Sequence, residues 1–124
     1  MTKGEIAKKY YESVVNCAQA VALSFKEELN MDETTIKKLI IGFGGGFGRQ
    51  KLVCGAISAM TMVLSYLKSD GIDKLASYAL IKEACEKAKE QIGSIICAEI
   101  MASKVVPCGK VCEIVADITY SYIK

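Results

Sequence analysis

The sixteen residues LVCGAISAMTMVLSYL, at positions 52–67, form the longest uncharged run in the chain. A membrane-spanning helix needs about 20 mostly apolar residues, so this run is too short to be one. It predicts instead a central helix, Cys54–Lys68, that is buried on most sides. The ten residues before it, GFGGGFGRQK at positions 42–51, are so rich in glycine that they predict an unusual loop.

Apolar residues elsewhere recur at helical spacing, and no stretch alternates as a strand does. Asn16 and Asp32 are good N-cap residues for the helices that follow them. Around the central helix we expect six further helices: Lys3–Glu12, Cys17–Leu29, Glu33–Ile41, Asp73–Gln91, Ile96–Met101 and Val111–Tyr122. The fold class is therefore all-α: a small helical bundle of five to seven helices in a single domain, residues 1–124, with the glycine-rich loop before the central helix.

Charge and composition exclude several classes of protein. The 124 residues include 16 basic and 14 acidic ones, a balance that does not fit an electrostatic nucleic-acid binder. The chain has no histidine, which excludes Ser-His-Asp and Cys-His catalysis and mixed Cys/His zinc sites. The charged N-terminus lacks the apolar segment of a secretory signal, so we expect a cytoplasmic protein without a membrane anchor.

Cysteine is the residue type most suggestive of chemistry, because in a reducing compartment six cysteines indicate metal or redox chemistry rather than a disulfide framework. No C-x-x-C pair occurs. Four of the six fall at predicted helix starts, where free N–H groups stabilise thiolates: Cys17, Cys54, Cys97 and Cys112. The alternative is that these cysteines are small buried hydrophobes. That alternative is favoured for Cys85, which lies mid-helix, whereas Cys108 lies in a Pro-Cys-Gly turn and is expected to be exposed.

The glycine-rich stretch does not match a phosphate-binding motif, since neither G-x-G-x-x-G nor G-x-x-x-x-G-K occurs in it. Its glycines allow the backbone to approach a bulky group and to direct N–H donors at it. We therefore expect Gly44, Gly45 and Gly46 to lie against a negatively charged group bound by thiolates. Arg49, the only arginine, would balance its charge. The alternative is a loop that serves only helix packing, with a solvated arginine beside it.

Several motifs resemble one family of proteins when they are taken in order. They are NCAQAV at 16–21, GFGGGFGR at 42–49, CGA at 54–56, GSIIC at 93–97 and a terminal helix led by a cysteine. This combination resembles the redox-active proteins of the C_GCAxxG_C_C family, which are similar to a region of the split-Soret cytochromes. The chain departs from the family motif at Ala59, which replaces its last glycine.

The resemblance implies an α-helical fold and a four-cysteine redox site that holds an iron–sulfur cluster. The ligands it implies are Cys17, Cys54, Cys97 and Cys112, with Cys108 competing for the fourth place. The expected role is electron transfer or redox sensing with another redox protein as partner. The alternatives are a structural zinc site, thiol–disulfide exchange without metal, and a helical interaction module whose cysteines belong to the core. The apolar helices and the tyrosines of the last segment, Tyr120 and Tyr122, make a homodimer possible, and a monomer is equally allowed.

Overall fold

The computed structural model describes residues 1–124 as an all-α fold without a named strand, as expected. It contains nine α-helical segments and one 3₁₀ turn, more than the five to seven helices predicted. The segments are α1 Lys3–Tyr11, α2 Cys17–Leu23, α3 Lys26–Leu29, α4 Glu33–Ile40, η1 Ile41–Phe43, α5 Gly44–Phe47, α6 Gly55–Lys68, α7 Lys74–Ile92, α8 Cys97–Ser103 and α9 Cys108–Ser121. None of these helices has both the length and the apolar character that crossing a membrane requires.

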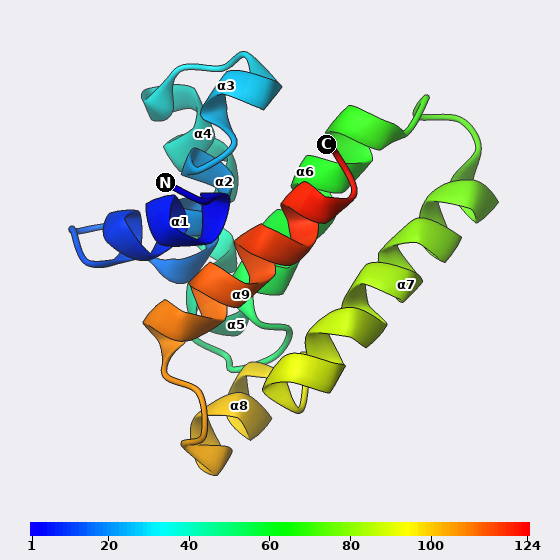
Figure 1. The fold of residues 1–124 in the computed structure, drawn as a ribbon. Coiled ribbons are helices and arrows are strands. Elements are labelled where there is room, and N and C mark those ends of the chain that lie inside the picture. Colours follow the sequence, from blue (N-terminus) through cyan, green and yellow to red (C-terminus); the bar gives the residue numbers. More distant parts are fainter.

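Helices α2, α6 and α9 pack together at the centre of the molecule (Figure 1). The predicted central helix is correct, since Ile57, Met60 and Val63 on α6 are at most 1% exposed. Alanines at alternate positions of α2 are completely buried, and their small side chains allow neighbouring helices to approach closely. Helices α1, α3 and α4 lie on one side of this centre, and α7 lies along the other.

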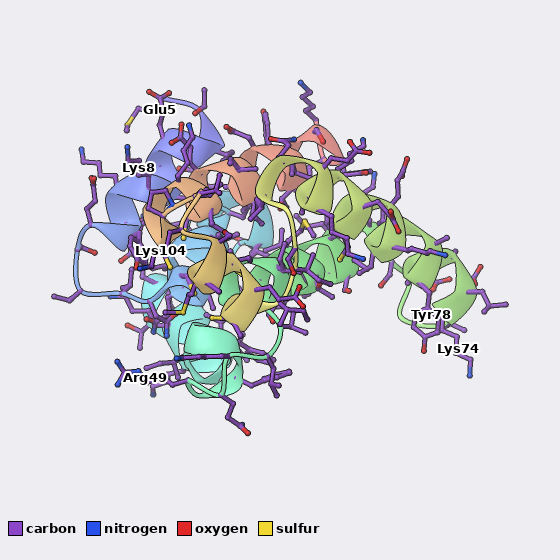
Figure 2. All side chains as sticks on the ribbon, turned by 90° about the horizontal axis from the view of Figure 1, so that it is seen from below. Glu5, Lys8, Arg49, Lys74, Tyr78 and Lys104 are labelled. Carbon is purple, nitrogen blue, oxygen red and sulfur yellow. The ribbon has the colours of Figure 1, made fainter.

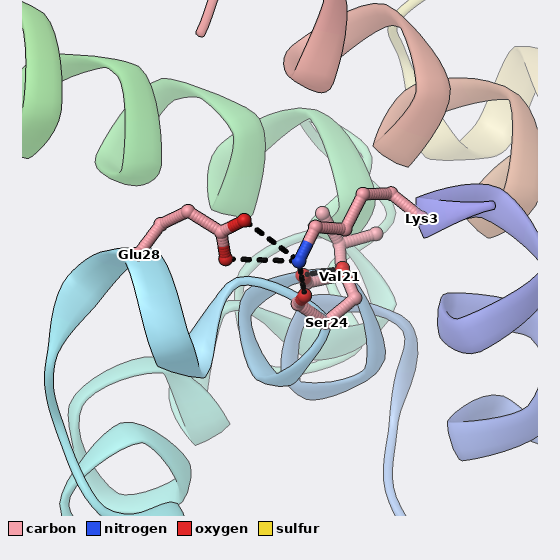
Figure 3. A network of polar contacts seen from close by, with 4 residues as sticks. All are labelled: Lys3, Val21, Ser24 and Glu28. Carbon is pink, nitrogen blue, oxygen red and sulfur yellow. Dashed lines mark hydrogen bonds and ion pairs between the residues drawn. The ribbon is translucent and has the colours of Figure 1, made fainter. Parts of the chain in front are cut away.

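The single helix predicted over Cys17–Leu29 is wrong, because it breaks at Phe25 into α2 and α3. The Lys3 ammonium donates to the Ser24 carbonyl at 2.9 Å, at the C-terminal end of α2, and pairs with Glu28 at 2.9 Å (Figure 3). The ammonium also lies 5.2 Å from the centre of the Phe25 ring. A cation is favourable beside the last carbonyls of a helix, so this contact stabilises the break and ties α1 to it.

The N-terminus of α1 is held by the last helix. The Asp117 carboxylate accepts the Gly4 N–H at 2.8 Å, which places a negative charge at the positive end of α1. A side chain at position 4 would collide with Asp117 and with the Glu113 carbonyl, so glycine is required for α1 and α9 to come this close.

Two other sequence predictions also need correction. The stretch predicted as a glycine loop is instead a 3₁₀ turn followed by the short helix α5, which contains left-handed residues at Gly45 and Gly46. The last helix begins at Cys108, three residues before the predicted Val111, with Pro107 as its N-cap. Proline suits this position because it has the required φ and because no hydrogen bond is needed from its nitrogen.

Candidate functional site

One cavity of about 900 Å³ brings four of the six thiols together. Its wall includes Cys17, Cys54, Cys97 and Cys108, which come from four separate helices. Cys54 is the N-cap of α6, and the other three are the first residues of α2, α8 and α9. The predicted helix-start positions of Cys17, Cys54 and Cys97 are correct, whereas the fourth thiol on the wall is that of Cys108 and not that of Cys112.

Cys112 does not lie at a helix start. It lies one turn into α9, is completely buried and is not part of the cavity wall. Its thiol donates to the Cys17 carbonyl at 3.8 Å, behind the cavity. Burial strongly raises the pKa of this thiol. Cys112 was expected at a helix start because the last helix was predicted to begin at Val111. The helix begins at Cys108 instead, so Cys108 is its first residue and Cys112 lies within it.

Cys17 is positioned by the residues that surround it in sequence. Asn16 caps α2 by accepting the Gln19 N–H at 2.9 Å, and the Gln19 side chain accepts the Asn16 N–H at 3.0 Å. The Asn16 side chain also donates to the Ile41 carbonyl at 3.0 Å, at the start of the glycine-rich segment. This reciprocal capping fixes the first turn of α2, and with it the place of Cys17.

Cys54 and Cys97 are held together by a short antiparallel bridge between Val53 and Ile96. The Cys54 N–H donates to the Ile95 carbonyl at 2.8 Å, and the Cys97 N–H donates to the Leu52 carbonyl at 2.6 Å. Two segments more than forty residues apart in sequence therefore begin their helices side by side.

Three glycines allow this arrangement, because a Cβ atom on any of them would collide with a neighbour. A Cβ at Gly55 would lie 2.6 Å from the Cys17 sulfur, and one at Gly46 would lie 2.9 Å from the Cys97 Cβ. A Cβ at Gly44 would overlap the Asn16 amide. The glycines thus bring the cysteine-bearing helix starts close to one another.

The predicted cofactor-binding residues do not all line the cavity. Gly44, Gly45 and Arg49 line the cavity, whereas Gly46 is buried outside the wall. Cys85 lies on α7, away from the cavity, as expected of a packing residue.

Sequence reasoning missed several wall residues. Tyr11, Lys51, Gly55 and Met101 all line the cavity. The Met101 sulfur lies 3.7 Å from the Cys97 sulfur. Cys97 and Met101 are four residues apart on a predicted helix, a spacing that could have indicated the contact. Lys51 could have been found from its place in the glycine-rich stretch, three residues before Cys54, whereas nothing in the sequence placed Tyr11 near the cysteines.

The electrostatics of the site are set by burial and by a lack of acidic neighbours. Burial raises the pKa of Cys54 to about 11, and hydrogen bonds from the backbone N–H groups of Ile57 and Ala56 partly oppose this rise. Burial also raises the pKa of Cys97, while Lys51 lowers it. Burial, followed by the nearby Cys108, raises the pKa of Tyr11 to about 12. The wall contains no Asp or Glu, so its donors to a metal would be sulfur atoms.

All six cysteines are free in this structure, and no three Cys, Asp or Glu side chains are grouped so that they could hold a single metal ion. The four wall thiols surround the cavity instead.

The model of one protein family, described as "Putative redox-active protein (C_GCAxxG_C_C)", matches residues 15–122. The chain belongs to this family. The match spans all four wall cysteines, the glycine-rich segment and α6, and it confirms the resemblance drawn from the motifs. No curated protein and no solved structure matches the chain.

Proposed function

We propose that this redox-active family member holds an iron–sulfur cluster in the cavity, with Cys17, Cys54, Cys97 and Cys108 as ligands. The observation that supports the proposal is the convergence of four thiols from four helix starts on one cavity. Iron–sulfur clusters are bound by cysteine thiolates, and thiolates are the ligands that this wall offers.

The residues present fit such a group in size and in chemistry. A single zinc ion lies about 2.3 Å from each of its sulfur ligands, so it would use little of a cavity of about 900 Å³. A cluster places several iron and sulfide atoms between the thiolates and makes better use of that space. Arg49 and Lys51 on the wall would offset its negative charge.

A bound cluster would supply reversible one-electron transfer. The chain itself would perform three tasks. Its helix starts hold the sulfurs in place, and the apolar wall residues Val15, Ile100 and Val111 limit the access of water. The Cys54 thiol, whose pKa burial raises to about 11, is protonated at neutral pH, so binding would release its proton to solvent. Free thiols of this kind suit a reducing compartment such as the cytoplasm.

Anaerobic reconstitution with iron and sulfide tests the proposal by the visible absorption spectrum and by the iron and sulfide content per chain. Serine in place of Cys17, Cys54, Cys97 or Cys108 should abolish or greatly reduce binding. Cys112→Ala and Cys85→Ser are the matched controls and should retain it.

Three results would contradict the proposal. The first is a colourless chain free of iron, and the second is one stoichiometric zinc ion bound in preference to iron. The third is loss of the cluster in Cys112→Ala with retention in Cys108→Ser, which would reinstate Cys112 as the fourth ligand. A thiol count that falls on oxidation of a metal-free chain would indicate disulfide chemistry instead.

A further inference from the structure

The surface around the cavity mouth combines exposed apolar side chains with cations. Ile41 and Met101 line the cavity and are 58% and 48% exposed. Phe47, in the glycine-rich stretch, and Leu52, directly after it, are 40% and 49% exposed. Large apolar side chains grouped in this way and surrounded by polar residues are typical of interaction sites, and Met and aromatic residues are enriched in protein interfaces.

The charged residues of the cavity wall, Arg49 and Lys51, are both cations. Two segments supply most of the cavity wall, and neither segment contains an acidic residue: positions 34–69 and positions 100–112. They contribute Arg49 and Lys51 to the wall, and Lys104 at the end of α8. None of these three cations forms an ion pair, since the three ion pairs of the molecule involve Lys3, Lys26 and Lys110. Glu99, the acidic residue of α8, accepts a hydrogen bond from Ser94.

The three cations also share an unfavourable backbone conformation. Arg49, Lys51 and Lys104 have φ values of 68°, 63° and 54°, in the left-handed region that favours glycine. Each such residue costs roughly 1 kcal/mol relative to glycine. Glycine already occupies left-handed positions nearby, at Gly45, Gly46 and Gly48. Long cationic side chains at costly positions, Arg49 and Lys51 on the cavity wall and Lys104 at the end of α8, indicate that their charge is used.

We propose that this mouth surface docks an acidic electron-transfer protein, so that its redox centre faces the cavity. The inference rests on the proposed function. Complementary charge would steer the partner, and the apolar side chains would form the dry centre of a small, transient interface. One electron would leave the reduced centre of the partner and enter the group in the cavity. The partner's centre is thereby oxidised by one electron, the bound group is reduced by one, and no atoms move.

The structure also offers a matched control surface at the far end of the molecule. Figure 2 shows Arg49 and Lys104 on one side of the molecule, while Lys74 and Tyr78 at the start of α7 lie on the opposite side. In Figure 1 the start of α7 is likewise far from α5 and α8. Lys74 and Lys82 are exposed on α7 and form no ion pair, so Lys74→Glu/Lys82→Glu changes the net charge as much as Lys51→Glu/Lys104→Glu does.

The test is stopped-flow transfer of electrons from a reduced acidic ferredoxin to the reconstituted full-length chain, with iron content measured for every variant. At low salt, Lys51→Glu/Lys104→Glu should lower the second-order rate constant about tenfold, and the control pair less than twofold. Raising the salt to about 0.5 M should remove the difference, since screening acts within a few ångströms at that concentration. If Lys51→Glu lowered the rate constant by changing the bound group itself rather than docking, the lower rate constant would persist at high salt. A rate constant that is independent of salt, or equal losses in the two pairs, would overturn the proposal.

Calorimetric titration of the same ferredoxin into the chain as isolated provides a second measurement that needs no cluster. Binding that weakens at least fivefold in Lys51→Glu/Lys104→Glu supports docking even if reconstitution fails, so failure of the proposed function and failure of docking are distinguishable. Lys104→Gly should also weaken binding, without lowering thermal stability. Tighter binding of a single-stranded oligonucleotide than of ferredoxin, or a self-associated chain that Lys51→Glu/Lys104→Glu dissociates, would refute an acidic protein partner.

Discussion

Substitution of Gly55 by alanine tests whether the cysteine-bearing helices are packed as tightly as the structure indicates. The new Cβ would lie 2.6 Å from the Cys17 sulfur and 2.9 Å from the Phe43 carbonyl oxygen. Ordinary contacts between non-bonded atoms are about 3.5–4.0 Å, so one helix start must move by roughly 1 Å. Overpacking of this kind costs about 1–3 kcal/mol, and the higher helix propensity of alanine returns up to about 1 kcal/mol.

We therefore expect Gly55→Ala to lower the free energy of unfolding by about 1–2 kcal/mol, measured by urea denaturation of the metal-free chain. Displacement of Cys17 should also reduce the iron content after reconstitution. Gly109→Ala is the matched control, because Gly109 likewise follows a cysteine at a helix start. Its Cβ would meet only the Tyr11 ring, at 3.4 Å, so this variant should not be destabilised.

A double-mutant cycle isolates the contact between Gly55 and Cys17. In a Cys17→Ala background the sulfur is gone, so the cost of Gly55→Ala should fall to that of its remaining contacts with the Phe43 carbonyl and the Ala18 nitrogen. A Gly55→Ala variant as stable as the original chain, or the same cost with and without the Cys17 sulfur, would refute the close packing inferred here.

Three further predictions concern stability. Burial raises the pKa of Cys54 from 9.0 to about 11, so the folded metal-free chain binds the thiol proton more tightly than the unfolded chain does. The resulting contribution to the free energy of unfolding, about 2–3 kcal/mol, should be present below pH 8.5 and lost as the pH rises through 11. Urea titrations at several pH values should show this dependence, and Cys54→Ala should flatten it. Lys3→Met should cost about 1–2 kcal/mol by thermal or urea unfolding, because it leaves Glu28 and the end of α2 without their cation. Lys104→Gly should raise the free energy of unfolding by about 0.5–1 kcal/mol, because glycine adopts the left-handed conformation without strain. A lower free energy of unfolding would show instead that the Lys104 side chain makes stabilising packing contacts.

Much of the fold follows from local sequence signals. The long uncharged run specified α6, and Asn16 and Asp32 were recognised as N-caps because capping depends on side chains only three residues apart. The apolar spacing of Val21, Phe25 and Leu29 identified buried residues correctly, although the helix breaks between them. Lys3 contacts that break from twenty-one residues away, and no local pattern contains such a contact.

The candidate site likewise follows in part from the sequence and in part from the tertiary structure. Three of the four wall cysteines were identified as helix starts from the sequence by itself, and the family motifs pointed to the same residues. The choice between Cys108 and Cys112 required the tertiary structure, because it depends on where α9 begins and which of its faces is buried. The contact of Gly55 with Cys17 and the cationic mouth likewise join segments far apart in the chain, and their distances are fixed only when the helices pack.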